Sequence, residues 1–322
     1  MWYVKMYFSG DKEIFEYDAS GMQGEPAVRQ EFPFLESLLS FQELECEAVI
    51  PSLEHVCNNW ELRITENNRQ AGTHALVALS ELANRHIYFK LLYVRWFDRF
   101  ARMGAHDDCG IAEDQQMLAE LKEVVEQIPQ YQKQIQRFFE LVLDVDQAGR
   151  DPQKQAWSNY YHNEPKDPEL FKFRPIPVSF EPTEEGRCSP GLYSASIPDM
   201  IDYSLRTCVE RDITVRRCKN CGRWFPQMVR VSAEYCERPV AEGQEVCREI
   251  GAFKQWTKKQ SDDPVFKIYR REYKKRFARI KAGNIDDDAF KLWSKKAREE
   301  KKKCDNGTIT LEEFKRWLAE SE

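Results

Sequence analysis

The chain has 322 residues, 42% hydrophobic and 32% charged, a composition typical of a globular protein with two or three domains. Its longest apolar runs are short and interrupted by charge, and its first residues lack the apolar core of a signal peptide. We therefore expect no transmembrane helix and no membrane partner. We expect a cytoplasmic location, where a reducing environment disfavours disulfides among the ten cysteines.

The net charge of −6 is distributed unevenly along the chain. Residues 1–210 contain 20 Lys and Arg against 35 Asp and Glu, a net charge of −15. Residues 211–322 contain 28 against 19, a net charge of +9. A basic C-terminal third is typical of a segment that faces nucleic acid, although a solvated basic surface produces the same pattern.

Hydrophobic periodicity predicts the first elements. Alternating residues over 2–8, a turn and the run IFEY predict a β-hairpin, and a helical pattern follows over about 33–48. Apolar residues at spacings of three or four then predict one long helix over about 70–103. A second helix is expected over about 112–146, where Pro129 should break or kink it. The N-terminal part is therefore predicted to be an antiparallel helical bundle.

Residues 150–196 have no helical period and are rich in proline, which indicates a connecting segment with one edge strand around IPVSF. A short amphipathic helix, IPDMIDYSLRTCVER, is expected next. The predicted fold class is mainly α with a small β component (α+β). The predicted parts are an acidic, mostly helical domain over 1–165, a proline-rich connector over 166–196, a four-cysteine finger over 197–260 and a basic helical tail over 261–322.

Four cysteines fall within 30 residues, separated by two, fourteen and ten residues: Cys218, Cys221, Cys236 and Cys247. Gly222 permits the tight turn that lets the first two thiolates face one ion. The sequence after Cys247 looks helical, and a thiolate is favoured at a helix N-terminus. This order is the outline of a treble-clef-like zinc finger. Such a closed four-thiolate site stabilises a fold and leaves no position for catalysis.

Three other interpretations of the cysteines remain open. A thioredoxin-like redox pair would need a βαβ context, which the neighbouring sequence lacks. An iron–sulfur cluster uses the same thiolate ligands. The four residues could also be unrelated thiols. Zinc is the interpretation that best accounts for the spacing of all four cysteines.

The run DITVRRCKNCGRWFPQ, with EYCERP and VCREIG after it, resembles the CGNR-type zinc fingers of bacterial transcription regulators over about residues 197–260. It is similar also to a family of uncharacterised bacterial proteins with the patterns C-x-N-C-G-x-x-F and Y-C-[DE]-R. In this chain CREIG replaces CGNRA, and the last two cysteines are more widely spaced. The resemblance implies a bacterial zinc protein that acts on nucleic acid.

A basic helix is predicted after Asp263, a good N-cap, with Pro264 in the first turn. Its cations could neutralise phosphates, or could equally form a solvated surface that pairs with acidic groups. Two similar segments follow at a period of 24 residues, 283–293 and 307–317, and a capping box is expected at Thr310 and Glu313. The candidate nucleic-acid-binding residues are Arg216, Arg217, Arg223, Arg270, Arg271, Lys274, Lys275 and Arg279.

Arg69 and His74 form an R-x4-H pair similar to the motif of metal-independent HEPN nucleases. The chain has no Walker motif, dinucleotide-binding glycine loop, HExxH or nucleophile elbow, so we favour a non-enzymatic role and assign no catalytic residue. The sequence thus predicts a cytoplasmic bacterial zinc protein that binds DNA or RNA, as a regulator or a mobile-element-associated factor. A protein-interaction scaffold with a docking basic tail, and a nuclease using Arg69 and His74, are the alternatives.

Overall fold

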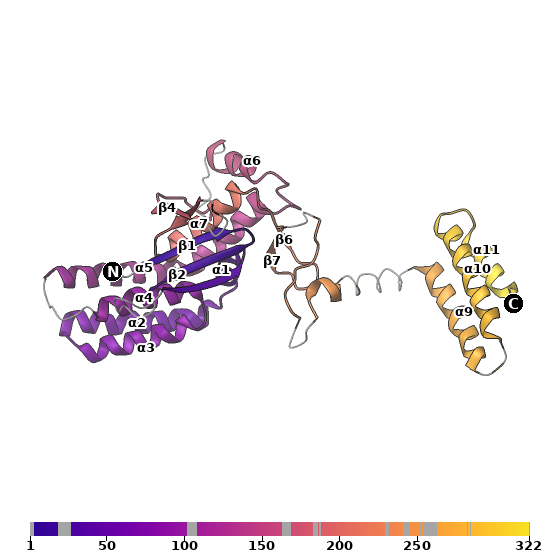
Figure 1. Ribbon diagram of the computed structural model, residues 1–322, viewed down its shortest axis with the longest axis horizontal. Helices are drawn as coiled ribbons and strands as arrows, with labels where there is room; N and C mark the ends of the chain where they lie inside the picture. The colour runs from indigo at the N-terminus through magenta and orange to yellow at the C-terminus, as the bar shows by residue number, and fades with distance from the viewer. Residues whose placement is uncertain are drawn as a thin grey trace. The chain divides into compact units, whose positions relative to one another are not determined.

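A computed structural model describes residues 3–18, 27–101, 108–162, 169–182, 186, 188–228, 232–240, 245–251, 253, 263–281, 283 and 285–321. The described chain is mainly helical with small antiparallel sheets, which confirms the predicted fold class (Figure 1). The chain divides into two compact units. The first contains residues 1–217 and 223–233, and the second contains residues 218–222 and 234–322.

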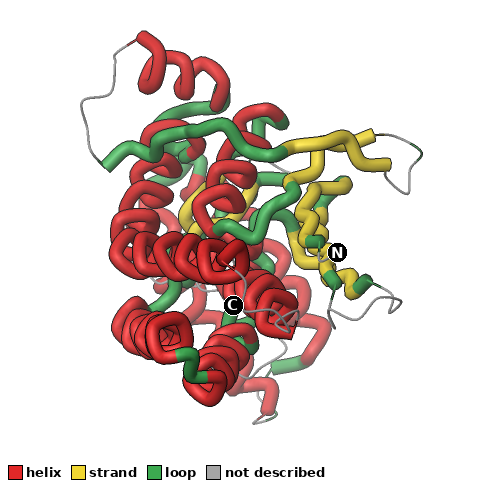
Figure 2. The backbone as a smooth tube through the Cα atoms, turned by 90° about the vertical axis from the view of Figure 1, so that its left-hand side faces the viewer, coloured by secondary structure: helices red, strands yellow, loops and turns green. Residues whose placement is uncertain are grey.

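The first unit contains an antiparallel five-stranded sheet in the order β3-β2-β1-β5-β4. Figure 2 shows its strands grouped together. The predicted hairpin is present, and the strand expected around IPVSF is an edge strand of this sheet. Two of the strands, β4 and β5, come from the proline-rich segment. The bounds are Val4–Ser9 for β1, Lys12–Tyr17 for β2, Val28–Pro33 for β3, Val178–Pro182 for β4 and Cys188–Leu192 for β5.

The helices of the first unit share one hydrophobic core with the sheet. Helix α3 packs against both α2 and α4, and α2 also packs against α5 (Figure 1). The described α-helices are α1 (Glu36–Gln42), α2 (Cys46–Glu66), α3 (Arg69–Ala83), α4 (Ile87–Ala101), α5 (Asp108–Phe138), α6 (Pro152–Trp157) and α7 (Ile197–Glu210). Two π-helical turns, η1 (Phe139–Leu143) and η2 (Ser158–His162), follow α5 and α6.

The prediction of one long helix over 70–103 is wrong, because the chain breaks between α3 and α4 at residues 84–86. The buried imidazole of His86 occupies this break. Its Nδ1 accepts a hydrogen bond from the backbone N–H of Tyr88 at 3.1 Å, and its Nε2 lies 3.0 Å from the carbonyl oxygen of Ser37. His86 therefore caps α4 instead of continuing an apolar stripe.

Pro129 does not break the second predicted helix, since α5 continues through it. A proline removes one backbone hydrogen bond from a helix. Here apolar residues on both sides of the proline, including Ile128 and Ile135, are fully buried in the core. Their burial outweighs the lost bond, because each large aliphatic side chain contributes about 1.5–3 kcal/mol.

The core of the first unit also buries a carboxyl group. Glu13 on β2 is completely inaccessible to solvent. Its Oε1 accepts the backbone N–H of Ser37 at 2.5 Å, and the Ser37 hydroxyl bridges Glu13 Oε2 and the hydroxyl of Tyr88 at 3.1 and 3.2 Å. Burial raises the pKa of Glu13 to about 8, against the opposing effect of the two hydrogen bonds from Ser37.

The second unit contains three further helices around a small core: α9 (Pro264–Lys281), α10 (Asp287–Asp305) and α11 (Leu311–Glu320). The Asp263 carboxylate caps α9, and Thr310 and Glu313 form the expected capping box of α11. Each copy of the 24-residue repeat begins with a glycine of positive φ, Gly283 at 72° and Gly307 at 73°. Each such glycine follows one helix, and a capped helix begins three or four residues later.

No helix in the described part of the chain is both long enough and apolar enough to cross a membrane.

Candidate metal centre and cationic surfaces

The four predicted ligands lie together in the second unit. The Sγ atoms of Cys218, Cys221, Cys236 and Cys247 are all within 4.8 Å of one another, and the side chains other than Cys221 are buried. Two of them stand in the short segment between β6 (Val215–Arg217) and β7 (Trp224–Pro226). Four cysteines this close together could hold a metal ion.

The first pair of cysteines is arranged by a tight turn. The backbone N–H of Gly222 donates to the carbonyl of Cys218 at 2.8 Å, and Gly222 has a φ of +75°. That left-handed conformation is costly for residues with a Cβ atom. The expectation that glycine permits this turn is therefore confirmed.

The second pair is positioned by an isolated β-bridge and a helix start. Pro239 and Val246 pair as an antiparallel bridge, and the N–H of Cys247 donates to the carbonyl of Arg238 at 2.9 Å. A helical stretch begins at Cys247 and runs to residue 251 within the described part. The predicted position of this cysteine at a helix N-terminus is confirmed, and the helix dipole there favours a thiolate.

Donors surround the sulfur atoms. The backbone N–H of Cys236 lies 3.4 Å from the Sγ of Cys218, and the side-chain amide of Asn220 donates to the Sγ of Cys247 at 3.4 Å. Burial would raise the pKa of Cys218, but backbone N–H groups of Cys221, Cys236 and Asn220 hold it at about 7. Such donors stabilise negative charge on sulfur.

Burial and the adjacent charge of Cys218 raise the pKa of Cys236 well above its ordinary value. Thiolates at these distances repel one another, so all four can ionise together only when a cation lies among them. The Sγ atoms of Cys221 and Cys236 are 3.7 Å apart. A tetrahedral ion with metal–sulfur bonds of about 2.3 Å would require about 3.8 Å between sulfurs. The donor set therefore fits a tetrahedral thiolate site.

Tyr235 and Gly251 support this centre, and sequence reasoning did not anticipate their contact. A Cβ atom at Gly251 would lie only 2.3 Å from the Tyr235 ring, so glycine lets the helical stretch approach the ring. The tyrosine of the Y-C-[DE]-R pattern therefore packs against the helix that begins at Cys247. The signal in the sequence was the glycine four residues after that cysteine.

The arginines beside the first cysteine pair contact carboxylates in the first unit. Arg216 makes two hydrogen bonds to the Asp146 carboxylate, at 2.9 and 2.8 Å, and its side chain is 12% exposed. Arg217 lies over the Trp224 ring at 4.5 Å and 3.6 Å from Glu140. These contacts stabilise the first unit, so any role in binding nucleic acid would compete with them.

Arg223 likewise lies 3.5 Å from Glu43, but its side chain is 59% exposed. Surface pairs of this kind contribute about 0–1 kcal/mol. Arg223 therefore keeps more freedom to contact a ligand than Arg216 does.

Helix α9 carries the other predicted binding residues, which are all exposed: Arg270, Arg271, Lys274, Lys275 and Arg279. Lys267 is exposed as well, and Glu272 is the single acidic residue of the helix. Arg276 stands among these cations in the sequence, but its side chain is buried. Its guanidinium donates to the carbonyls of Leu318 and Ser321 at the end of α11 and lies 4.5 Å from the centre of the Trp293 ring.

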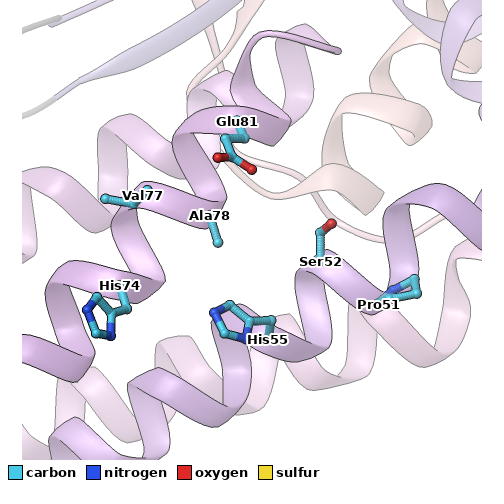
Figure 3. Close-up of a pocket in the computed structure, with 7 residues that line it drawn as sticks. All are labelled: Pro51, Ser52, His55, His74, Val77, Ala78 and Glu81. Atoms are coloured by element: carbon cyan, nitrogen blue, oxygen red, sulfur yellow. The ribbon is translucent and has the colours of Figure 1, made fainter.

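Arg69 and His74 both lie on α3, five residues apart. On an α-helix, residues five apart are separated by about 140° around the axis. Arg69 lies 5.8 Å from the Phe100 ring. His74 lines an open surface depression between α2 and α3, with His55 on its other side (Figure 3). No hydrogen bond joins Arg69 to His74 among the described residues, so their geometry gives the nuclease alternative no support, and it stays a prediction.

A family described as a family of unknown function (DUF6076) matches residues 187–322. The match includes all four cysteines and α9 to α11, and also β5, α7, β6 and β7 of the first unit. No curated protein and no solved structure matches the chain. The family description names neither a metal nor an activity.

Proposed function

We propose that the chain is a zinc-binding protein that binds nucleic acid through helix α9. One observation carries the second part of this proposal. Six lysine and arginine side chains of α9 are exposed, against one acidic residue. A helix with this surplus of positive charge attracts the phosphates of nucleic acid, because each neutralised phosphate releases condensed counterions.

Zinc is supported by the ligand set. Four cysteine sulfurs form a closed site, which is the usual arrangement of structural zinc in proteins. The ion would hold together the turn at Gly222 and the helix start at Cys247, and its binding free energy would contribute to folding. The residues that would hold it are Cys218, Cys221, Cys236 and Cys247.

Metal analysis of the purified protein tests this part. We expect about one zinc per chain and its loss in Cys221→Ser, whereas Cys188→Ser, which changes an exposed cysteine outside the cluster, should keep it. Iron with acid-labile sulfide and visible absorption would show an iron–sulfur cluster instead. A metal-free protein that folds normally would refute both.

A salt series of gel shifts tests the nucleic-acid part. If three to six cations contact phosphates, log K should fall with log salt with a slope of about −2 to −5. The double substitution Lys274→Glu and Lys275→Glu should weaken binding at least about tenfold and reduce the slope. Lys295→Glu and Lys296→Glu on α10 make the same charge change at two other exposed lysines and serve as the matched control. Absence of binding at low salt, or binding without a salt slope, would refute the proposal.

We place this activity in the cytoplasm of a bacterium, in a regulator or a mobile-element-associated factor, because the run DITVRRCKNCGRWFPQ, with EYCERP and VCREIG after it, resembles CGNR-type fingers. The alternative partner of α9 is an acidic protein surface. In that case the charge reversal at Lys274 and Lys275 would abolish capture of the protein partner, and nucleic acid would not compete for it.

A further inference from the structure

Five of the six exposed cations of α9 form two groups that differ in their surroundings, and the sixth, Arg279, belongs to neither. Arg271 and Lys275 lie 3.9 and 3.5 Å from the carboxylate of Glu272. Lys267, Arg270 and Lys274 have no carboxylate within ion-pair distance among the residues that the structure describes. Because residues three and four apart share a helix face, these three form one continuous stripe along α9.

An exposed aromatic ring lies in the same stripe. Phe277 follows Lys274 by three residues, and 46% of its surface is accessible to solvent. Its ring is stacked on that of Tyr273 at an interplanar angle of 9° and is tilted against Phe290. The ring is thus held in place on one side while its other side faces solvent.

From Lys267 to Phe277 the stripe is about 15 Å long, at 1.5 Å per residue. That length matches roughly four nucleotides at the 3.4 Å spacing of stacked bases in one strand. In a duplex the faces of the bases are covered by their neighbours, whereas in a single strand they are free to stack on an aromatic side chain. Cations beside an exposed ring are the combination that binds single strands without sequence preference.

We infer that the stripe Lys267–Arg270–Lys274–Phe277 binds single-stranded nucleic acid, with the three cations on phosphates and the Phe277 ring stacked on a base. This inference rests on the proposed function and narrows it to one class of ligand. Lys267 and Phe277 are additional binding residues, and Arg271 and Lys275 contribute less because Glu272 already offsets their charge.

Fluorescence anisotropy with the full chain tests the inference, using a labelled 15-nucleotide oligo-dT, the RNA equivalent and a 15-base-pair duplex. We expect the single strands to bind more tightly than the duplex at equal salt. Phe277→Ala should weaken single-strand binding about 5- to 100-fold, the range of a lost base–aromatic contact, and leave duplex binding unchanged. Phe277→Trp should retain it. Leu292→Ala removes another exposed apolar residue, 57% exposed on α10, and should have no effect.

The adjacent lysines separate the two groups of cations. Lys274→Ala should weaken single-strand binding more than Lys275→Ala does, although both remove one exposed charge. The inference would be wrong if Lys274→Ala and Lys275→Ala weakened single-strand binding equally. It would also be wrong if the duplex bound as tightly as the single strands and Phe277→Ala changed neither affinity. Both outcomes would leave the proposed function intact. If no nucleic acid binds at low salt, the proposed function itself fails.

Discussion

Replacing Glu13 with glutamine should make the first unit more resistant to rising pH. Glu13 is buried in the core, and its pKa is raised from an ordinary value of 4.5 to about 8. The folded state therefore keeps a proton that the unfolded state loses, so stability is fully present below pH 4.5 and is lost as the pH rises toward 8. The whole pKa difference corresponds to roughly 4 to 5 kcal/mol, at about 1.4 kcal/mol per pKa unit.

The useful window lies between pH 6.5 and 8. Over this range the free energy of unfolding of the wild-type protein should fall by roughly 2 kcal/mol because Glu13 ionises. The glutamine variant has no group that ionises at this position and should not show this fall. Glutamine reproduces the neutral carboxyl, since its oxygen can accept the Ser37 N–H and its amide can donate to the Ser37 hydroxyl. For a unit of this size, the difference in Tm between Glu13→Gln and the wild-type protein should grow by about 4 to 8 °C from pH 6.5 to pH 8.

Thermal melts followed by circular dichroism at several pH values in this window provide the measurement. Glu16→Gln on the same strand is the matched control. The Glu16 carboxylate is partly buried beside Lys5 and Tyr7, and its pKa is lowered from 4.5 because hydrogen bonds to these two side chains outweigh its burial. The contribution of the Glu16 carboxylate to stability is therefore present at every pH above 4.5 and does not change between pH 6.5 and 8. Parallel Tm curves for wild type and Glu13→Gln would refute the reasoning.

Burial lowers the pKa of His86 to about 4, so the stability that its neutral ring contributes should be lost as the pH falls from 6.5 to 4. Acid denaturation should show this loss in the wild-type protein and not in His86→Gln. Gly251→Ala should lower the affinity of the four-cysteine site for its metal ion about tenfold or more in a chelator competition, because the new Cβ meets the Tyr235 ring. Tyr235→Ala in the same chain should restore part of the loss, and an unchanged affinity in Gly251→Ala would contradict the packing. Arg276→Ala should destabilise the bundle of α9 to α11 by about 2 to 4 kcal/mol, since it leaves the last carbonyls of α11 without their donor. Lys275→Ala, at the exposed neighbouring position, should change the stability of the bundle by less than about 0.5 kcal/mol. Hydrogen exchange of the bundle measures both effects.

Local chemistry made several features predictable. The β-hairpin, the cap at Asp263, the capping box at Thr310 and the turn at Gly222 each depend on a few neighbouring residues, and all are present. The convergence of the four cysteines was predictable from their number and spacing, since few other arrangements place thiols at those intervals.

Other features depend on contacts between distant residues. The break at His86 is stabilised by Ser37, 49 residues away, and the strand β5 pairs with β1 across more than 180 residues. Periodicity could not show either contact. Arg276 has the same local pattern as the exposed cations of α9, and only the position of α11 distinguishes it. The continuity of α5 through Pro129 likewise depends on the core that its neighbours fill.

The division of the chain has a consequence for how the protein can change over generations. The second unit takes residues 218–222 from within a stretch that otherwise belongs to the first, and resumes only at residue 234. No single cut in the chain separates the two units. A cut between residues 222 and 233 would separate the first two cysteines of the cluster from the last two. A single recombination point in the gene therefore cannot exchange either unit as one uninterrupted block.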